Sequence, residues 1–249
     1  MNVVVTGAGT GIGKATVKEF LERGDTVFMV GRRKDKLESA YDELKQYGTL
    51  HVFPSDVSNW DDMVALGELL EKNGGCDVLV NNAGVFKGGI LHTIDKDDFE
   101  NIFNINVKGI VYASMVLIPQ MLKKNKGAIV NVASLAGMGG EESMPLYCST
   151  KGAVIALTRA MALDYARLGI RVNVVSPAAT RTPMMMANTQ EVLDTTVRGT
   201  PDGRIAEPED ISNAIVFLAS DKASHLCGVN IPVDGGLTAW SGSPNQGRD

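Results

Sequence analysis

The sequence has few of the residues that build disulfide frameworks and metal sites. Only three cysteines, Cys76, Cys148 and Cys227, and three histidines occur among its 249 residues. The cysteines are widely separated and form no CxxC pair, so neither a zinc knot nor a disulfide framework is predicted. No HExxH or paired-carboxylate motif is present, and we predict no bound metal. Reduced, structural cysteines are typical of cytoplasmic proteins, and that is the location we expect.

Long apolar runs and an excess of positive charge are missing as well. No apolar stretch approaches the ~20 residues that a membrane-spanning helix needs. The chain opens on an apolar segment without the basic region and cleavage site of a signal peptide. The net charge is −5, whereas binding to a nucleic acid requires a basic face. We therefore expect neither a membrane nor a nucleic acid as a partner.

Short, apolar, β-branched segments alternate with helix-like segments along the whole chain. The predicted strands are Met1–Thr6, Thr26–Val30, Leu50–Pro54, Val78–Val80, Gly127–Val132, Ile170–Val175 and Val229–Val233. They are nearly all apolar, which is typical of parallel strands covered by helices on both faces. We predict an α/β fold, a Rossmann-type doubly wound parallel sheet in a single domain over residues 1–240, with a polar tail at 241–249.

Some of the predicted helices are more apolar than contact with one sheet requires. Helical spacing predicts helices at Gly11–Arg23, Lys34–Tyr47, Asp98–Lys123 and Tyr147–Arg167. The last two carry apolar residues on more than one face, so each should be buried on more than one side. One side can face the sheet and another can face a second copy of the chain. We expect a homo-oligomer, a dimer or homotetramer, with contacts through the 98–123 and 147–167 helices.

A glycine-rich turn, TGAGTGIG at Thr6–Gly13, separates the first predicted strand from the first predicted helix. A strict GxGxxG motif would have glycine at Ile12, whereas the glycines here are Gly7, Gly11 and Gly13. Glycine permits positive φ and close approach of the backbone to phosphates, and a helix N-terminus attracts an anion. A glycine cluster alone also fits a tight structural turn. Its position between strand and helix predicts a dinucleotide-binding site.

The end of the second predicted strand bears on the choice of cofactor. An acidic residue at this place would bind the ribose 2′-hydroxyl of NAD. Here Gly31 takes that place and is followed by Arg32 and Arg33. A guanidinium without a competing carboxylate suits a 2′-phosphate. We therefore favour NADP(H), with NAD(H) possible. A solvated basic turn is the alternative interpretation of the arginines.

Further motifs follow in the second half of the chain. They are NNAG at Asn81–Gly84, Ser134 after a strand and YCSTK at Tyr147–Lys151. Together with the glycine turn they resemble the short-chain dehydrogenase/reductase family, from the first strand to VDGG at Val233–Gly236. The resemblance implies one Rossmann-type domain with about seven parallel strands. It also implies NAD(P)-dependent hydride transfer to or from a carbonyl or alcohol carbon.

The resemblance also assigns roles to particular residues. The implied cofactor-binding residues are Gly7, Thr10, Gly11, Ile12 and Gly13 at the pyrophosphate, Asp56 and Val57 at the adenine, Asn81, Ala83 and Gly84 beside the ribose, and Tyr147, Lys151, Pro177 and Thr182 toward the nicotinamide. Arg32 and Arg33 are added to the predicted cofactor-binding residues from the end of the second strand. The implied catalytic residues are Asn106, Ser134, Tyr147 and Lys151. One departure is Ala178, since the family usually has glycine after the proline. Its methyl group near the nicotinamide can slightly reshape the pocket.

The chemistry of carbonyl reduction explains why these residue types are needed. A tyrosine hydroxyl can supply the proton, but its ordinary pKa of ~10 is too high unless a nearby ammonium favours the phenolate. Tyr147 and Lys151 are four positions apart, so they share one helix face. Ser134 would hold the substrate oxygen, and the resemblance implies that Asn106 anchors a water linking Lys151 to solvent. The same Tyr–Lys spacing is common on helix surfaces, so the assignment depends on the glycine turn and NNAG.

The substrate pocket should lie among loops at the carboxyl ends of the strands. The candidate segments are Leu135–Leu146 and a substrate loop at about 178–206, which contains Met184–Met186. The methionines fit an adaptable apolar lid, and they fit a short helix packed on the core equally well.

Several functions compete for this site. The first is an NADPH-dependent ketone or 3-oxoacyl reductase, and the alternative is an NAD-dependent sugar, polyol or secondary-alcohol dehydrogenase. In either case the partner is a small-molecule carbonyl or alcohol. A non-catalytic dinucleotide-binding sensor is less favoured, because the Ser, Tyr, Lys and Asn positions are all filled. An acidic acyl carrier would require basic residues near the pocket, and Arg181, Arg198 and Arg204 are too scattered to decide.

Overall fold

A computed structural model describes residues 1–239 of the chain as alternating strands and helices. The strands are β1 (Asn2–Thr6), β2 (Thr26–Gly31), β3 (Leu50–Pro54), β4 (Val78–Asn81), β5 (Gly127–Val132), β6 (Ile170–Pro177) and β7 (Asn230–Val233). The helices are α1 (Gly11–Glu22), α2 (Lys34–Leu44), α3 (Trp60–Lys72), α4 (Lys96–Phe103), α5 (Gly109–Lys124), α6 (Pro145–Tyr165), α7 (Pro183–Met186), α8 (Gln190–Gly199) and α9 (Pro208–Ala219). The polar tail predicted at 241–249 lies outside the described residues.

The strands form one seven-stranded sheet in the order β3-β2-β1-β4-β5-β6-β7. Every pairing is parallel; in β1, for example, Val3 pairs with Val27 of β2 and with Val78 of β4. The predicted doubly wound parallel sheet is therefore confirmed. The strand order reverses between β1 and β4, and ligands of such sheets bind beyond the carboxyl ends of the strands at that point.

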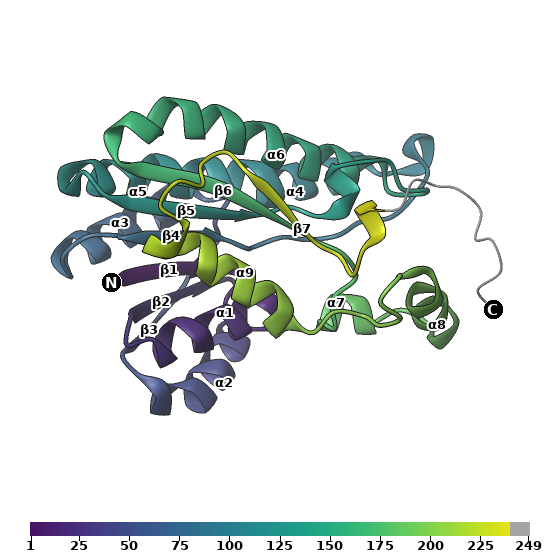
Figure 1. Ribbon diagram of the computed structural model, residues 1–249, viewed down its shortest axis with the longest axis horizontal. Coiled ribbons are helices and arrows are strands. Elements are labelled where there is room, and N and C mark those ends of the chain that lie inside the picture. The colour runs from purple at the N-terminus through teal and green to yellow at the C-terminus, as the bar shows by residue number, and fades with distance from the viewer. Residues whose placement is uncertain (240–249) are drawn as a thin grey trace.

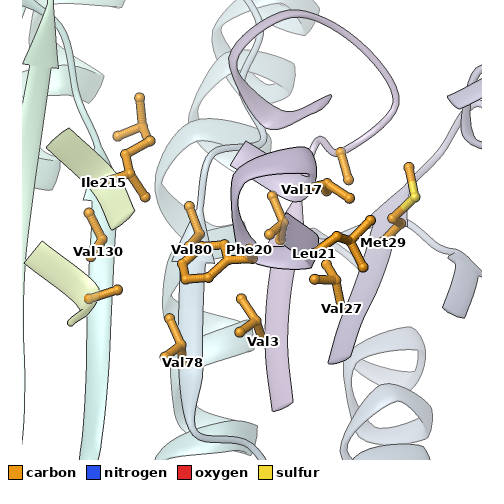
Figure 2. Close-up of a cluster of buried hydrophobic side chains, with 14 of the residues drawn as sticks. Val3, Val17, Phe20, Leu21, Val27, Met29, Val78, Val80, Val130 and Ile215 are labelled. Atoms are coloured by element: carbon orange, nitrogen blue, oxygen red, sulfur yellow. The ribbon is translucent and has the colours of Figure 1, made fainter. Parts of the chain in front are cut away.

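Successive residues of each central strand enter two different cores, one on each face of the sheet. Val3 and Val5 of β1 pack with α1, α2 and α9, whereas Val4 packs with α3, α5 and α6. Figure 2 shows the first core, where Phe20 of α1 lies over Val80. Each fully buried side chain of this size stabilises the fold by about 1.5–3 kcal/mol. Because helices cover both faces of the sheet, the strand sequences are continuous apolar runs and do not alternate between apolar and polar residues.

The helix predicted at Asp98–Lys123 is longer and less regular than its sequence indicates. It starts at Lys96, because the Asp95 side chain accepts a hydrogen bond from Asp97 N (2.8 Å) and caps it. Between α4 and α5 the segment Asn104–Lys108 forms a π-helical turn. By length and composition Lys96–Lys124 could cross a membrane, but half of its most apolar window is buried inside the molecule. Its buried residues face the sheet, as those of a core helix do.

Helix α6 also differs from its predicted bounds of Tyr147–Arg167. It begins at Pro145, which suits the first turn because proline has no N–H to leave unpaired there, and it ends at Tyr165. Tyr147 therefore lies in the first turn of the helix, beside the carboxyl end of the sheet. In Figure 1 the strands run toward the side where α7 and α8 lie, and these two short helices extend beyond that edge.

Candidate active site

The glycine turn joins β1 to α1 at the carboxyl edge of the sheet. Gly7 and Gly11 have φ of 66° and 53°, a region that side chains disfavour. A Cβ at Gly13 would lie 2.3 Å from the carbonyl oxygen of Gly7, so no side chain fits there. The first backbone N–H groups of α1 have no partner within the helix and attract an anion. The turn therefore has the shape and polarity that a pyrophosphate needs, and this part of the chain fits the implied dinucleotide.

Hydrogen bonds from the end of β4 hold the glycine turn in place. Thr6 Oγ1 accepts from the backbone N–H groups of Asn82 and Ala83, each at 3.0 Å. The Asn82 amide donates to the carbonyl oxygens of Thr6 (2.9 Å) and Gly7 (3.3 Å). Both motifs are evident in the sequence, but the roles of the Thr6 and Asn82 side chains were not predicted from it. The signal was present, because Thr6 and Asn82 are the polar residues next to the glycines and within NNAG.

The other residues of NNAG point in different directions. Asn81 is buried, and its amide donates to Asn131 Oδ1 (2.9 Å), whose own amide donates to Thr158 Oγ1 (2.8 Å) in α6. The Asn81 side chain is thus occupied inside the protein. Gly84 faces the catalytic side, since a Cβ there would lie 3.6 Å from Lys151 Nζ. NNAG therefore connects the glycine turn to α6.

The ends of β2 and β3 bring the predicted adenosine-binding residues together. Arg32 Nη1 lies 3.8 Å from Asp56 Oδ2, whereas Arg33 Nη2 donates to Thr10 Oγ1 (3.4 Å) in the glycine turn. Val57 is buried against Gly109, with little side chain left for a ligand. Ser55 Oγ is buried without a hydrogen-bond partner among the described residues. An orphaned hydroxyl next to Asp56 is consistent with a polar ligand at this place.

Ser134, Tyr147 and Lys151 lie together beyond the carboxyl end of β5. Ser134 follows β5, and its Oγ accepts from the N–H of Ala136 (3.2 Å). Lys151 Nζ lies 5.7 Å from the centroid of the Tyr147 ring and donates to the carbonyl oxygen of Val132 (2.9 Å). The structure thus brings together three residues that lie up to 17 positions apart in the sequence, 151 minus 134.

Burial sets the protonation of this group. Loss of water raises the pKa of the Tyr147 phenol, and a hydrogen bond with Ser134 opposes that change. Loss of water also lowers the pKa of Lys151 to about 8. Both shifts follow from the cost of placing a charge in a dry environment. In the protein without ligands, Tyr147 is therefore a protonated acid at neutral pH.

Asn106 lies in the π-helical turn and is fully buried. Its Oδ1 accepts from the N–H of Val85 (2.8 Å), and its amide donates to the carbonyl of Val85 (2.9 Å) and to Thr150 Oγ1 (3.1 Å). A π-turn inserts one residue and re-aims the side chains, and such turns are frequent at functional sites. Asn106 therefore fixes the chain after NNAG to the catalytic helix, a role that the sequence did not predict.

The substrate loop returns to the glycine turn. Its two ends are joined by hydrogen bonds from Arg181 N to the Ala206 carbonyl (2.8 Å) and from Ala206 N to the Ala179 carbonyl (3.1 Å). Beyond Pro177, which ends β6, Thr182 caps α7, and its methyl group would be 2.8 Å from a Cβ at Gly11. Thr182, predicted toward the nicotinamide, thus lies against Gly11, predicted at the pyrophosphate.

The methionine segment is only partly packed. Met184 and Met186 are exposed (48% and 41%) and Met185 is half-buried. The alternative that the methionines pack on the core is therefore wrong for Met184 and Met186. Within residues 1–239, no group of three or more His, Cys, Asp or Glu side chains could hold a metal ion.

Comparison with known proteins gives the family. The family model described as enoyl-(acyl carrier protein) reductase matches residues 7–238. Meso-2,3-butanediol dehydrogenase of Serratia marcescens is 41% identical over 244 residues, covering 97% of this chain and 96% of that protein. The chain belongs to the short-chain dehydrogenase/reductase family. The resemblance inferred from the motifs is confirmed, and the protein is an NAD(P)-dependent oxidoreductase of alcohol and carbonyl groups.

Other members of the family agree with this assignment. A 3-oxoacyl-[acyl-carrier-protein] reductase of Thermotoga maritima is 35% identical and covers 94% of this chain and 96% of its own. The crystal structure of levodione reductase has a TM-score of 0.92 at 28% identity, covering 96% of this chain and 97% of that one. An actinorhodin polyketide ketoreductase with NADPH has a TM-score of 0.91 at 28% identity and the same coverage. The match to the family model, over residues 7–238, includes the positions of all the predicted site residues.

Proposed function

We propose that this short-chain dehydrogenase/reductase is an NADP(H)-preferring enzyme that interconverts small, uncharged ketones and secondary alcohols. The observation that carries the proposal is the meeting of Ser134, Tyr147 and Lys151 beside a glycine turn shaped for a pyrophosphate. A sensor that only binds a dinucleotide needs the turn but not the three side chains.

The proposed roles follow from the hydrogen bonds of these residues. A bound nicotinamide cofactor supplies the hydride. Ser134 Oγ accepts from Ala136 N, and its one O–H can donate to the substrate oxygen in place of its hydrogen bond with Tyr147. Tyr147 gives its proton to the same oxygen as charge develops there. Lys151, oriented by the Val132 carbonyl, stabilises the resulting phenolate when it carries its proton.

The cofactor preference is proposed from the end of β2. Gly31 leaves no carboxylate to repel a 2′-phosphate, and both arginines follow it. Arg32 is drawn toward Asp56, whereas Arg33 already reaches the glycine turn at Thr10. We therefore assign the larger part of 2′-phosphate binding to Arg33, with Arg32 second. The solved structure of the related actinorhodin polyketide ketoreductase with NADPH supports this preference.

The substrate class is proposed from the charges of the substrate loop. Arg181 is paired with Glu207 (2.8 Å), and Arg204 is paired with Asp202 (3.2 Å) and Asp210. These pairs neutralise two of the arginines that an acidic acyl carrier would need. The exposed methionines of the same loop favour an apolar substrate, and the butanediol dehydrogenase relative acts on a small diol. An acyl-carrier substrate is the second candidate, favoured by the relative from Thermotoga maritima.

The test is the steady-state oxidation of NADPH and NADH with diacetyl, acetoin and acetoacetyl-CoA as substrates. We expect turnover of the small ketones with NADPH, and weaker turnover of the thioester. Arg33→Ala should raise the KM for NADPH about tenfold, because a charged hydrogen bond is lost, and should leave that for NADH unchanged. The control is Lys45→Ala at the far end of α2, where the ammonium pairs with Asp42. Equal use of both cofactors by the wild type would contradict the assignment.

A homo-oligomer, with a homotetramer favoured, is proposed from the outer faces of α5 and α6. Met115 is 56% exposed and Leu163 83% exposed. A surface groove of about 450 Å³ runs beside Leu163 and is flanked by Arg159 and Arg167. Light scattering should give a multiple of the 26.5 kDa chain mass, and Leu163→Glu should reduce it. The cytoplasmic location is proposed because all three cysteines are free thiols.

A further inference from the structure

An aromatic side chain outside the motifs of the sequence lies against Tyr147, the proposed proton donor. The ring of Phe86 is 5.3 Å from the ring of Tyr147, centroid to centroid, with an interplanar angle of 76°. This is an edge-to-face contact, which aromatic pairs prefer. The Tyr147 ring thus has two close neighbours, the apolar ring of Phe86 and the ammonium of Lys151. Phe86 was not among the residues that the sequence singled out.

The backbone next to Phe86 is fixed to the catalytic helix. Both polar groups of the preceding residue, Val85, are bonded to the side chain of Asn106. The amide of Asn106 is in turn bonded to Thr150 in α6. These buried hydrogen bonds fix the position of the Phe86 backbone relative to α6, which carries Tyr147, and so they determine the aromatic contact.

Phe86 also presents an open surface. It is 42% exposed despite its contact with Tyr147. The loop that follows it is joined to the loop before α6, because Gly89 N donates to the carbonyl of Ser143 (2.7 Å). Apolar side chains on these two loops, Ile90 and Met138, are exposed as well. A large aromatic face that is left bare beside a proton donor is suited to contact a substrate.

We propose that Phe86 is a positioning and specificity-determining residue, whose ring excludes water from Tyr147 and forms the apolar wall that receives the alkyl substituent of the reacting carbonyl carbon. This rests on the proposed function. It narrows the substrate class to ketones and secondary alcohols with an alkyl group next to the reacting carbon.

The first experiment compares 2-butanone with hydroxyacetone, in which a hydroxymethyl group replaces the ethyl group. The wild type should prefer 2-butanone, and Phe86→Ala should lower kcat/KM for 2-butanone about tenfold, as loss of apolar contacts in a pocket does, with little change for hydroxyacetone. Phe86→Leu should keep most of the preference. The matched control is Phe217→Ala in α9, since Phe217 is also 42% exposed. Equal losses on both ketones would overturn the specificity role.

The second experiment measures the ionisation of Tyr147 without any substrate. Tyrosinate absorbance is followed with pH, and the curve of a matched Tyr147→Phe variant is subtracted. Burial raises the pKa of Tyr147, so admitting water by Phe86→Ala should lower that pKa. In the reductive direction the basic limb of kcat/KM should then move to lower pH, and Phe86→Leu should restore it. If Phe86 had a merely structural role, Phe86→Ala would leave both the tyrosinate titration curve and the basic limb of kcat/KM in place, and that result would contradict the proposal.

The two proposals can fail separately. If the wild type turns over no ketone with either cofactor while Tyr147 titrates as described, the proposed function fails and the positioning role stands. If the wild type reduces ketones but Phe86→Ala behaves like Phe217→Ala in both experiments, the inference about Phe86 fails alone. A fluorescence titration with NADPH checks that each variant still binds the cofactor.

Discussion

The cofactor half and the substrate half of this site are built in different ways. Around the glycine turn the shape is set by backbone, with Thr6 and Asn82 bonding to main-chain groups on both sides. Around the substrate loop, exposed side chains are held by surface ion pairs such as Arg181–Glu207. Such pairs contribute only about 0–1 kcal/mol. A half made of backbone tolerates little change, whereas a half made of exposed side chains can differ between relatives with different substrates.

The largest expected effect removes the chemistry and leaves the cofactor half whole. Tyr147→Phe should lower kcat by roughly 100- to 10,000-fold, because a general acid is lost. The phenylalanine ring keeps the contact with Phe86, and NADPH binding should persist in a fluorescence titration. A variant that keeps wild-type turnover would show that another group donates the proton.

The next effect concerns Lys151, which lies where the two halves meet. Its pKa is lowered from 10.5 to about 8 by burial, so between these pH values the unfolded chain binds more protons than the folded one. The free energy of unfolding contributed by Lys151 therefore rises with pH across that window. At pH 7, Lys151→Met should raise the free energy of unfolding by up to about 3 kcal/mol while abolishing activity.

Denaturant titrations of the wild type and Lys151→Met between pH 7 and 10 check this prediction. The difference in stability should be largest at pH 7 and should shrink toward pH 10. Above 10.0 the Tyr147 phenol, whose pKa is raised, keeps its proton in the folded state and opposes further gain. A difference that does not depend on pH would show that Lys151 is not buried as described.

A matched pair of glycine substitutions tests the two halves directly. At Gly13 a Cβ would lie 2.3 Å from the Gly7 carbonyl oxygen, whereas at Gly199 a Cβ would have no heavy atom within 4 Å apart from its chain neighbours and the adjoining helix backbone. Gly13→Ala should lower the free energy of unfolding by about 2 kcal/mol through overpacking and should weaken NADPH binding. Gly199→Ala should change stability by less than about 0.5 kcal/mol. Equal effects on thermal unfolding would remove the distinction between the halves.

The sequence predicted the fold well because its strongest signals are local. Runs such as Val3–Val5 identify strands, and glycines between strand and helix identify the turn. The spacing of Tyr147 and Lys151 survives folding because one helix carries both. Each of these features depends on residues that are neighbours along the chain.

What the sequence did not show depends on distant contacts. The π-helical turn at Asn104–Lys108 adds one residue within what the sequence predicted as one regular helix, Asp98–Lys123. The choice between Arg32 and Arg33 depends on Asp56 and Thr10, which come from other segments. Phe86 meets Tyr147 only because the sheet places their two strand ends side by side.

The most direct test of the account follows the hydride itself. NADPH carrying deuterium at C4 of the nicotinamide, in each of its two configurations, is incubated with diacetyl, and the product alcohol is examined by mass spectrometry. The account predicts one added deuterium on the new carbinol carbon from one configuration and none from the other. Absence of label from both configurations would contradict the central claim that this site transfers a hydride to a carbonyl carbon.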